Sequence, residues 1–366
     1  MNNCLLDYLN MITPYLSSEL VSPYFISRMK KISRTLKPTW GAFLECPLGE
    51  DKNTVHFSIH ALDDAINLPS KIHSESIWKR IQQLCMDCNH SKSRLSQEVG
   101  SIFLDFKLSQ ENAEIPIPSI FLILQEGDLQ CLNGDIKTFC TWLTQKIIEP
   151  LNSRTISSYL EKNLELSLSA LPIGAQVLEL GIMQPSPLDS IKLSISGICP
   201  KDISDYLTAI GWIGSLVELE KLVLFLNDIV DAIVVKVELG VTVAPSVSFD
   251  CFIYQDLSKD NCWQPLFDFL IENQLCTPKK YVALLNWSGL SDKQYCLPPD
   301  NLKMISDFLG NRASSILLRE VNHIEITYTE NELDAKAHLC FSPDWNLTEK
   351  SLCNLDLTKK AFKGGI

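Results

Sequence analysis

The length and composition of this chain favour one large folded unit. Its 366 residues are 46% hydrophobic and 21% charged, so they can fill a sizeable core, and no apolar run reaches the ~18 residues that a membrane span needs. A formal net charge of −12 disfavours the electrostatic, phosphate-led binding of long nucleic acids.

The predicted elements begin with one or two helices at residues 7–36. Ten segments that alternate apolar and polar residues follow in five pairs, each joined by a connection short enough for antiparallel pairing. The pairs are residues 41–48 with 54–62, 101–108 with 119–125, 176–183 with 190–198, 232–239 with 247–254, and 317–328 with 334–342. Helical periodicity fills the gaps, at residues 74–88, 135–148, 156–171, 201–210, 215–230, 263–275 and from Thr277 onward.

This order of elements predicts five helix–strand–strand–helix units. We expect an α+β fold in which ten antiparallel strands close into a β-barrel with the helices outside. Ser215 and Glu218 have the spacing of a capping box in front of a long apolar helix. No low-complexity linker divides the chain, so residues 1–345 are predicted as one domain and residues 346–366 as a polar tail.

The cysteines and the N-terminus indicate the compartment. Thirteen cysteines, an odd number spread along the chain, suit a reducing compartment better than a disulfide framework. Residues 1–10 have no basic region followed by an apolar stretch, so we expect a cytoplasmic protein with no membrane partner.

Two arrangements of metal-ligand residue types occur in the sequence. Cys85, Cys88 and His90 have a spacing known from zinc sites, but no second ligand cluster follows at a finger-like distance, and the cysteines fit one apolar helix face. His56 and His60 share a strand face, where they would lie about 13 Å apart, too far to hold one ion. We therefore assign no metal ligands.

The alternation also predicts which residues point into the barrel. If helices cover the outside, apolar residues face them and the polar or aromatic residues between them face the lumen. A ten-stranded barrel has a lumen wide enough for a ligand, and so many charged groups are costly to desolvate unless water or an anion accompanies them. The alternative is an open sheet whose polar face meets solvent. The inward charged residues and histidines are Glu45, His56, His60, Asp105, Lys107, Glu179, Lys192, Lys236, Glu238, Asp250, Arg319, His323, Glu325, Lys336 and His338.

Five consecutive helix–strand–strand–helix units over roughly residues 1–345 resemble the ABBA prenyltransferases. These PT-barrel enzymes include indole, phenol and cyanobactin peptide prenyltransferases. The resemblance rests on the order of the elements and implies transfer of an isoprenyl group from an allylic diphosphate to an aromatic small molecule or a peptide in the barrel. Members of the family hold the diphosphate with inward lysines and arginines. Here that implies Lys192, Lys236, Arg319 and Lys336.

The implied chemistry accounts for the types of residue. Fixed cations stabilise the pyrophosphate that departs when the allylic diphosphate ionises. Aromatic faces stabilise the allylic cation without attacking it. A base must then take the proton of the substituted acceptor, and we favour Glu45, with His56 second. The expected walls of the prenyl and acceptor pocket are Phe43, Phe103, Phe252, Tyr254 and His338.

Magnesium and a non-catalytic role remain open at this point. Some soluble members of the family require Mg²⁺, but the sequence has no DDxxD motif, since Asp63 and Asp64 are followed by Ala65 and Ile66. A hydrolase is a poorer interpretation because no GxSxG motif accompanies the histidines. The main alternative is a non-catalytic barrel that presents a peptide or a small metabolite to partner enzymes.

Overall fold

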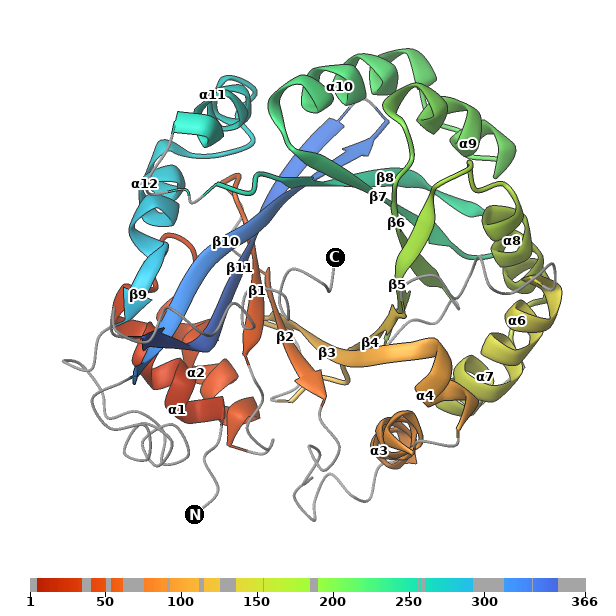
Figure 1. The fold of residues 1–366 in the computed structure, drawn as a ribbon, viewed down its shortest axis with the longest axis horizontal. Coiled ribbons are helices and arrows are strands. Elements are labelled where there is room, and N and C mark those ends of the chain that lie inside the picture. The colour runs from red at the N-terminus through yellow and green to blue at the C-terminus, as the bar shows by residue number, and fades with distance from the viewer. Residues whose placement is uncertain are drawn as a thin grey trace.

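Antiparallel strands close into a barrel, and helices surround it in a ring (Figure 1). This arrangement is seen in a computed structural model of the chain. The residues it describes are 5–34, 41–50, 54–61, 76–90, 93–111, 115–125, 136–153, 155–184, 190–255, 257, 261–291, 313–330 and 332–347. Asp63 and Asp64 and most of the predicted tail lie outside these residues.

Apart from one short strand, each strand pairs with the next along the chain, and the last pairs with the first. The ring runs from β1 to β8, continues through β10 and β11, and closes where β11 pairs antiparallel with β1. A short strand, β9, adds to the first part of β10 outside this ring. The strands are β1 (Ala42–Pro47), β2 (Thr54–Ala61), β3 (Val99–Ser109), β4 (Ser119–Leu124), β5 (Gln176–Ile182), β6 (Ile191–Ser196), β7 (Ala232–Leu239), β8 (Val243–Phe252), β9 (Gly289–Ser291), β10 (Ala313–Thr329) and β11 (Glu332–Leu347).

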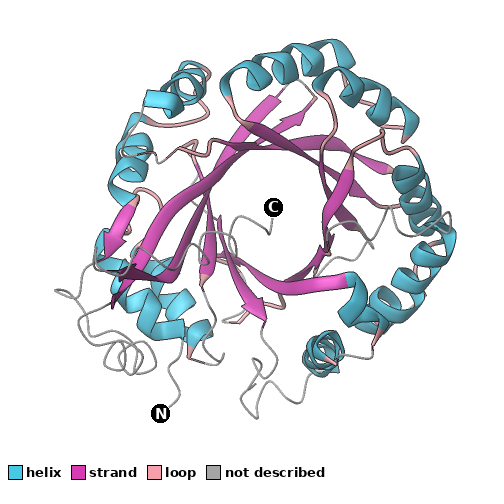
Figure 2. Ribbon diagram, viewed as in Figure 1, coloured by secondary structure: helices cyan, strands magenta, loops and turns pink. Residues whose placement is uncertain are grey.

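The helices lie on the outer side of the strands, as the two colours of Figure 2 show. None of the helices in the described part of the chain has the length and hydropathy needed to cross a membrane. The helices are α1 (Leu5–Ile12), α2 (Pro23–Ser33), α3 (Ser76–Asn89), α4 (Arg94–Glu98), α6 (Ile136–Leu143), the π-helical turn η2 (Thr144–Ile148), α7 (Glu149–Asn152), α8 (Ser158–Ser169), α9 (Ile203–Ala209), α10 (Leu216–Ile229), α11 (Gln264–Glu272) and α12 (Pro278–Trp287).

Helix starts follow the sequence signals in one case and depart from them in another. Thr277 precedes Pro278 and its hydroxyl accepts a hydrogen bond from the Lys280 N–H at 3.3 Å, which satisfies one of the unpaired donors of α12. Ser215 is the N-cap of α10, but its side chain makes no capping bond, so the predicted capping box with Glu218 is wrong.

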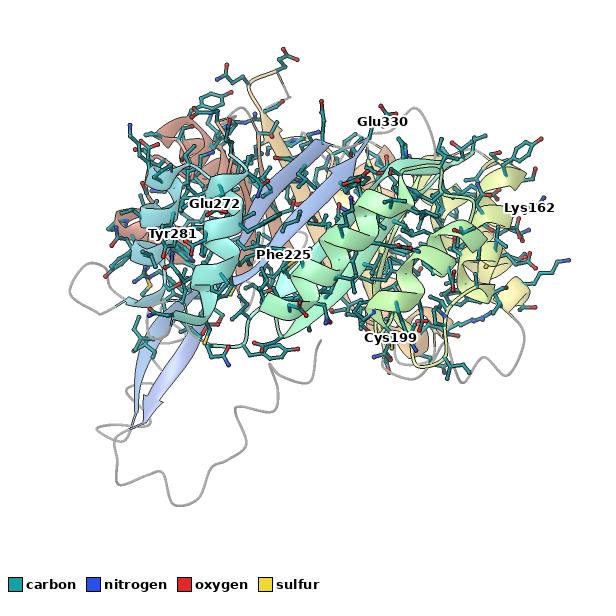
Figure 3. The ribbon with its side chains drawn as sticks, turned by 90° about the horizontal axis from the view of Figure 1, so that it is seen from above. Lys162, Cys199, Phe225, Glu272, Tyr281 and Glu330 are labelled. Atoms are coloured by element: carbon teal, nitrogen blue, oxygen red, sulfur yellow. The ribbon has the colours of Figure 1, made fainter. Side chains whose placement is uncertain are left out.

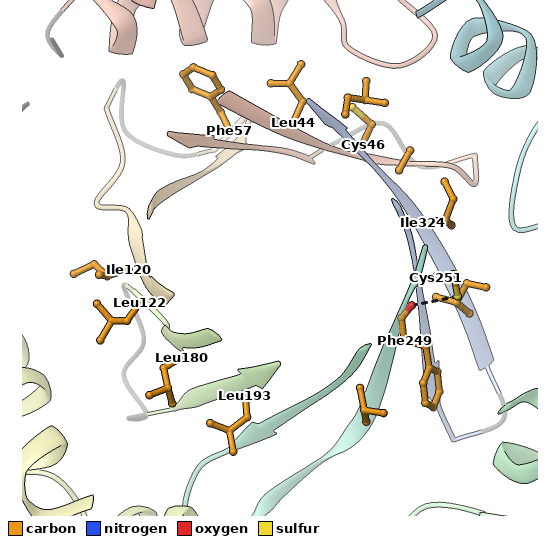
Figure 4. Close-up of a cluster of buried hydrophobic side chains, with 14 of the residues drawn as sticks. Leu44, Cys46, Phe57, Ile120, Leu122, Leu180, Leu193, Phe249, Cys251 and Ile324 are labelled. Carbon is orange, nitrogen blue, oxygen red and sulfur yellow. Dashed lines mark hydrogen bonds between the residues drawn. The ribbon is translucent and has the colours of Figure 1, made fainter. Parts of the chain in front are cut away.

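The apolar core lies between the barrel wall and the helices. On β1 and β2, Leu44, Cys46 and Phe57 are fully buried and point toward the helices (Figure 4). Burying one such side chain contributes about 1.5–3 kcal/mol, and the pattern repeats around the ring. Because apolar residues alternate with polar ones, the same geometry turns the polar side chains inward.

Neighbouring helices also contact one another around the outside. The ring of Phe225 on α10 lies 4.7 Å from that of Phe269 on α11, and the rings of Phe267 and Tyr281 join α11 to α12 at 4.6 Å. Phe225 and Tyr281 can be found on the outer surface in Figure 3. These contacts join α10, α11 and α12 into one continuous layer.

A β-bulge interrupts β10. Its pairing with β11 shifts between Val321 and His323, so that Val321 faces Leu339 while His323 faces His338. Before the bulge, odd-numbered residues such as Leu317 point outward. After it, even-numbered residues such as Ile324 do so. One extra residue therefore exchanges the two faces of the strand.

The seam between β1 and β11 is tightly packed. A Cβ atom added to Gly41, just before β1, would lie 2.5 Å from the backbone oxygen of Phe341, closer than real Cβ contacts. Glycine at this position allows the first strand to approach the last.

Candidate active site

Three lysines from three strands converge on one carboxylate inside the barrel. Lys236 of β7, Lys336 of β11 and Lys192 of β6 have their Nζ atoms 2.9, 3.5 and 3.7 Å from oxygens of Glu325 on β10. The strand register explains part of this, because Glu325 lies directly opposite Lys336 on one side and Asp250 of β8 on the other. We call Glu325 and these three lysines the lysine centre.

Charge pairing outweighs burial at this centre. Burial of the Glu325 carboxyl, which is 2% exposed, would raise its pKa, but Lys192, Lys236 and Lys336 hold that pKa well below its usual range. Burial would likewise lower the pKa of Lys236, whereas Asp250, at 2.7 Å, and Glu325 raise it well above normal. Glu325 and Lys236 are therefore charged at neutral pH.

A polar cavity of about 150 Å³ adjoins the lysine centre. Besides the ammonium groups it offers hydroxyls, and those of Ser248 and Thr327 are hydrogen-bonded to each other at 2.8 Å. Cations and hydroxyl donors around a space of this size suit a phosphate-like anion. The cavity is lined by Lys192, Lys236, Glu238, Ser246, Ser248, Glu325, Thr327 and Lys336.

The two candidate bases lie beside each other on the first hairpin. Glu45 faces His56 across β1 and β2, and Lys336 Nζ lies 3.6 Å from Glu45 Oε2, which connects Glu45 to the lysine centre. Burial would raise the pKa of Glu45, but His338, His56 and Lys336 lower it below its usual range. Glu45 is thus a weak base.

A buried carboxylate, that of Asp105, holds His56 in place. The sequence predicted Asp105 in the lumen but assigned it no role. His56 Nδ1 lies 2.7 Å from Asp105 Oδ2, and the Ser58 hydroxyl donates to the other Asp105 oxygen at 2.6 Å. Burial lowers the pKa of His56, but Asp105 and then Glu45 outweigh it, and the pKa is raised. This pairing fixes the ring and makes His56 the stronger base of the two.

The predicted aromatic residues fall into two groups. Phe43 and Phe103 meet edge to face with centroids 5.7 Å apart, and His60 lies 5.1 Å from Phe103. Phe252 lies apart from them, 4.8 Å from His323. His338, expected in the acceptor pocket, stacks on His323 at 3.9 Å, and burial followed by His323 lowers its pKa to about 3.

Solved structures with this architecture exist. The chain superimposes on 6-dimethylallyltryptophan synthase from Micromonospora olivasterospora, solved in complex with DMASPP and Trp, with a TM-score of 0.54 and 8% identity over 91% of this chain and 96% of that one. A second structure, 6-dimethylallyl tryptophan synthase, superimposes with a TM-score of 0.53 and 9% identity. The match covers 93% of this chain and 97% of that one. This chain has the PT-barrel fold. The predicted fold is confirmed.

Sequence comparisons do not detect this similarity. No protein-family model matches the chain, and no curated protein does. The likeness thus lies in the ten-stranded barrel and its helices.

Arg319 does not point into the PT barrel, so its predicted position is wrong. It lies before the bulge of β10, opposite Phe341 on the outward face. Its guanidinium donates to the backbone oxygens of Trp287 and Leu290 and lies 3.7 Å from the centroid of the Tyr15 ring. Arg319 therefore ties α12 and the N-terminal segment to the barrel wall.

The predicted position of Tyr254 in the wall of the pocket is also wrong. β8 ends at Phe252, and Tyr254 is 67% exposed beyond it, with its backbone N–H donated to Asp231 Oδ2. A residue so exposed cannot enclose a reactive cation.

The zinc-like spacing in α3 has a structural explanation. Cys85 is buried in the core, and the Cys88 thiol donates to the backbone oxygen of Val99 at 3.8 Å. No disulfide links the cysteines that the structure describes.

Proposed function

We propose that this PT barrel is a prenyltransferase and that the lysine centre binds the diphosphate of an allylic co-substrate. The convergence of Lys192, Lys236 and Lys336 on one polar cavity carries the proposal. One of the similar solved structures is described as a complex with DMASPP and Trp, which supports the proposal. Ammonium groups fixed in place before the reaction stabilise the negative charge of departing pyrophosphate.

The reaction proposed is electrophilic prenylation. The carbon–oxygen bond of the allylic diphosphate breaks, and its electron pair leaves with pyrophosphate at the lysines. A carbon of an electron-rich acceptor forms the new bond with the allylic cation. The acceptor then loses a proton, and its ring electrons are restored.

His56 is the better proton acceptor in this scheme. A general base acts best when its pKa lies near the working pH, and the pKa of Glu45 is far below that range while the pKa of His56 is raised above its ordinary value. Glu45, negatively charged beside Lys336, stabilises the positive charge on the acceptor before the proton leaves.

The aromatic pair Phe43 and Phe103 lies on the same hairpins as the proposed base. Phe43 neighbours Glu45 on the inward face of β1, and Phe103 stands opposite His60 on β2. Their rings provide the apolar faces against which a cation is stabilised without being attacked. An indole or another electron-rich aromatic group, free or within a peptide, is the acceptor class we propose.

One carboxylate that lines the cavity is suited to bind magnesium. Mg²⁺ prefers carboxylate oxygens together with phosphate oxygens and water. Of the two carboxylates that line the cavity, Glu325 is held by three ammonium groups, so Glu238 would be the ligand. A bound magnesium ion would supply further positive charge for the diphosphate.

Calorimetry with dimethylallyl and geranyl diphosphates, with and without Mg²⁺, tests the proposal. We expect saturable binding that is lost in a Lys192→Ala, Lys336→Ala variant and kept in a Lys107→Ala, Lys162→Ala variant, whose lysines do not line the cavity. Incubation with dimethylallyl diphosphate and tryptophan should add one isoprenyl mass. A folded protein that binds no allylic diphosphate would contradict the proposal and leave the non-catalytic barrel.

A further inference from the structure

A second group of buried polar side chains lies beside the lysine centre. Asp250 of β8, His323 of β10 and His338 of β11 each offer one ligand atom, and these atoms all lie within 4.8 Å of one another. The three residues are only 4%, 8% and 6% exposed. None of them lines the polar cavity next to the lysines.

All three ligand atoms lack a hydrogen-bond partner among the described residues. They are Asp250 Oδ1, His323 Nε2 and His338 Nε2. Leaving a buried polar group unsatisfied costs about 1–3 kcal/mol, and native proteins contain few such groups. Three of them gathered at one point indicate that something else satisfies them together.

The contacts of His323 narrow what that can be. Asn322 Oδ1 lies 2.6 Å from His323 Nδ1, so Nδ1 is already paired and Nε2 is the ring nitrogen left for a ligand. His323 Nε2 lies 3.4 Å from Asp250 Oδ1, close to it but without the geometry of a hydrogen bond. An ion placed between these two atoms would be bound by both.

The rest of the surroundings orients these ligands. Lys236 holds the other oxygen of Asp250 at 2.7 Å, which turns Oδ1 toward the two imidazoles. The ring of His338 is buried against His323, with the two planes 24° apart. The neutral imidazole is the form that binds metal ions.

We propose that Asp250, His323 and His338 form a binding site for a divalent transition-metal ion of the zinc class. Two imidazole nitrogens with one carboxylate oxygen are a common ligand set for such ions, and they leave a coordination position open. In a tetrahedral zinc site the ligand atoms lie about 3.3 Å apart. The pair of His323 and Asp250 already has this spacing, and the ligand atom of His338 lies within 4.8 Å of both.

A second cluster of possible ligands serves as a contrast. Glu45, His56 and Asp105 also lie close together. There, however, His56 and Ser58 already satisfy both oxygens of Asp105. This cluster has no need of an ion, which is why we assign the metal to the first.

Metal titration of tag-free, EDTA-treated protein tests the site. We expect one Zn²⁺ per chain by calorimetry, and visible absorption when Co²⁺ is bound instead. His323→Gln and His338→Gln should each weaken Zn²⁺ binding by more than about 100-fold, since loss of an outer-shell partner alone weakens such sites about 10–100-fold. His56→Gln and His90→Gln are the matched controls and should bind normally.

A measurement on the wild-type protein keeps the test independent of how the variants fold. X-ray absorption at the zinc edge should show two imidazole nitrogens with oxygen and no sulfur. Sulfur in the first shell would place the ion at the cysteines and overturn the assignment. So would unchanged affinity in His323→Gln, or absence of binding together with an NMR spectrum that shows His323 as an imidazolium paired with Asp250.

Discussion

Glu45 lies opposite His338 across the seam that closes the barrel, with Glu45 Oε1 4.0 Å from His338 Nδ1. Glu45 belongs to the first strand and His338 to the last. Lys336, two residues before His338, reaches both Glu45 and Glu325. One stretch of β11 therefore connects the candidate base, the lysine centre and the proposed metal ligands.

Replacement of Lys236 by Met should destabilise the fold strongly. Lys236 is 8% exposed, and its removal leaves Asp250 and Glu325 as buried charges that have lost their closest cation. Breaking such a network costs about 3–5 kcal/mol, measurable by urea unfolding. Lys221→Met removes an exposed pair with Glu218 and should cost less than about 0.5 kcal/mol. Equal effects would contradict the importance of the buried network.

Replacement of Glu325 by Gln should strengthen the binding of inorganic pyrophosphate. Glu325 occupies the point on which three lysines converge, so its charge opposes any anion in the cavity. Removing one negative charge at this distance should raise the affinity at least about fivefold in calorimetry. Glu179→Gln, which alters a carboxyl bonded to Ser194 outside the cavity, should have a smaller effect. Loss of pyrophosphate binding in Glu325→Gln would show that the lysines only pair with Glu325 and do not bind an anion.

Stability should depend on pH through His56. Its folded-state pKa is raised by Asp105 and Glu45 against the effect of burial, so its contribution is complete below the unfolded value of about 6.5 and is lost as pH rises through the folded pKa. The unfolding free energy of the wild type should therefore exceed that of Asp105→Asn most at about pH 6 and least at about pH 9. A difference that stays constant or grows with pH would contradict this assignment, and NMR titration of His56 measures the pKa directly.

Replacement of Arg319 by Gln should lower stability without changing anion binding. The guanidinium bonds to Trp287 and Leu290 outside the barrel, and the buried Trp287 carbonyl that loses its donor costs about 2 kcal/mol. Pyrophosphate affinity should remain that of the wild type, whereas Lys336→Gln should reduce it. If Arg319→Gln lost affinity for pyrophosphate while its stability stayed unchanged, the position of Arg319 outside the lumen would be contradicted.

The sequence predicted the barrel well because its signals are local. Alternation of apolar and polar residues marks each strand regardless of its partners, and short connections imply antiparallel pairs. The same alternation correctly predicted that Lys192, Lys236 and Lys336 point inward. The three-residue strand β9 and the short helix α4 are too brief to show a period.

The errors come from features that one residue controls. Arg319 was placed inward because it has the parity of His323, and the bulge between them reverses that parity without any visible break in the pattern. Tyr254 was placed by extending an alternation past the end of β8. The convergence of the lysines on Glu325 depends on register and on side-chain length across several strands, which a single sequence does not contain.

The seam between β1 and β11 also governs how the chain must fold. Its pairing joins segments separated by almost the whole sequence, and contacts of such long range form slowly. Until β11 docks, β1 and β10 present unpaired edges to which other chains can add. The protein is therefore most prone to aggregate during its synthesis, before its last strand has left the ribosome.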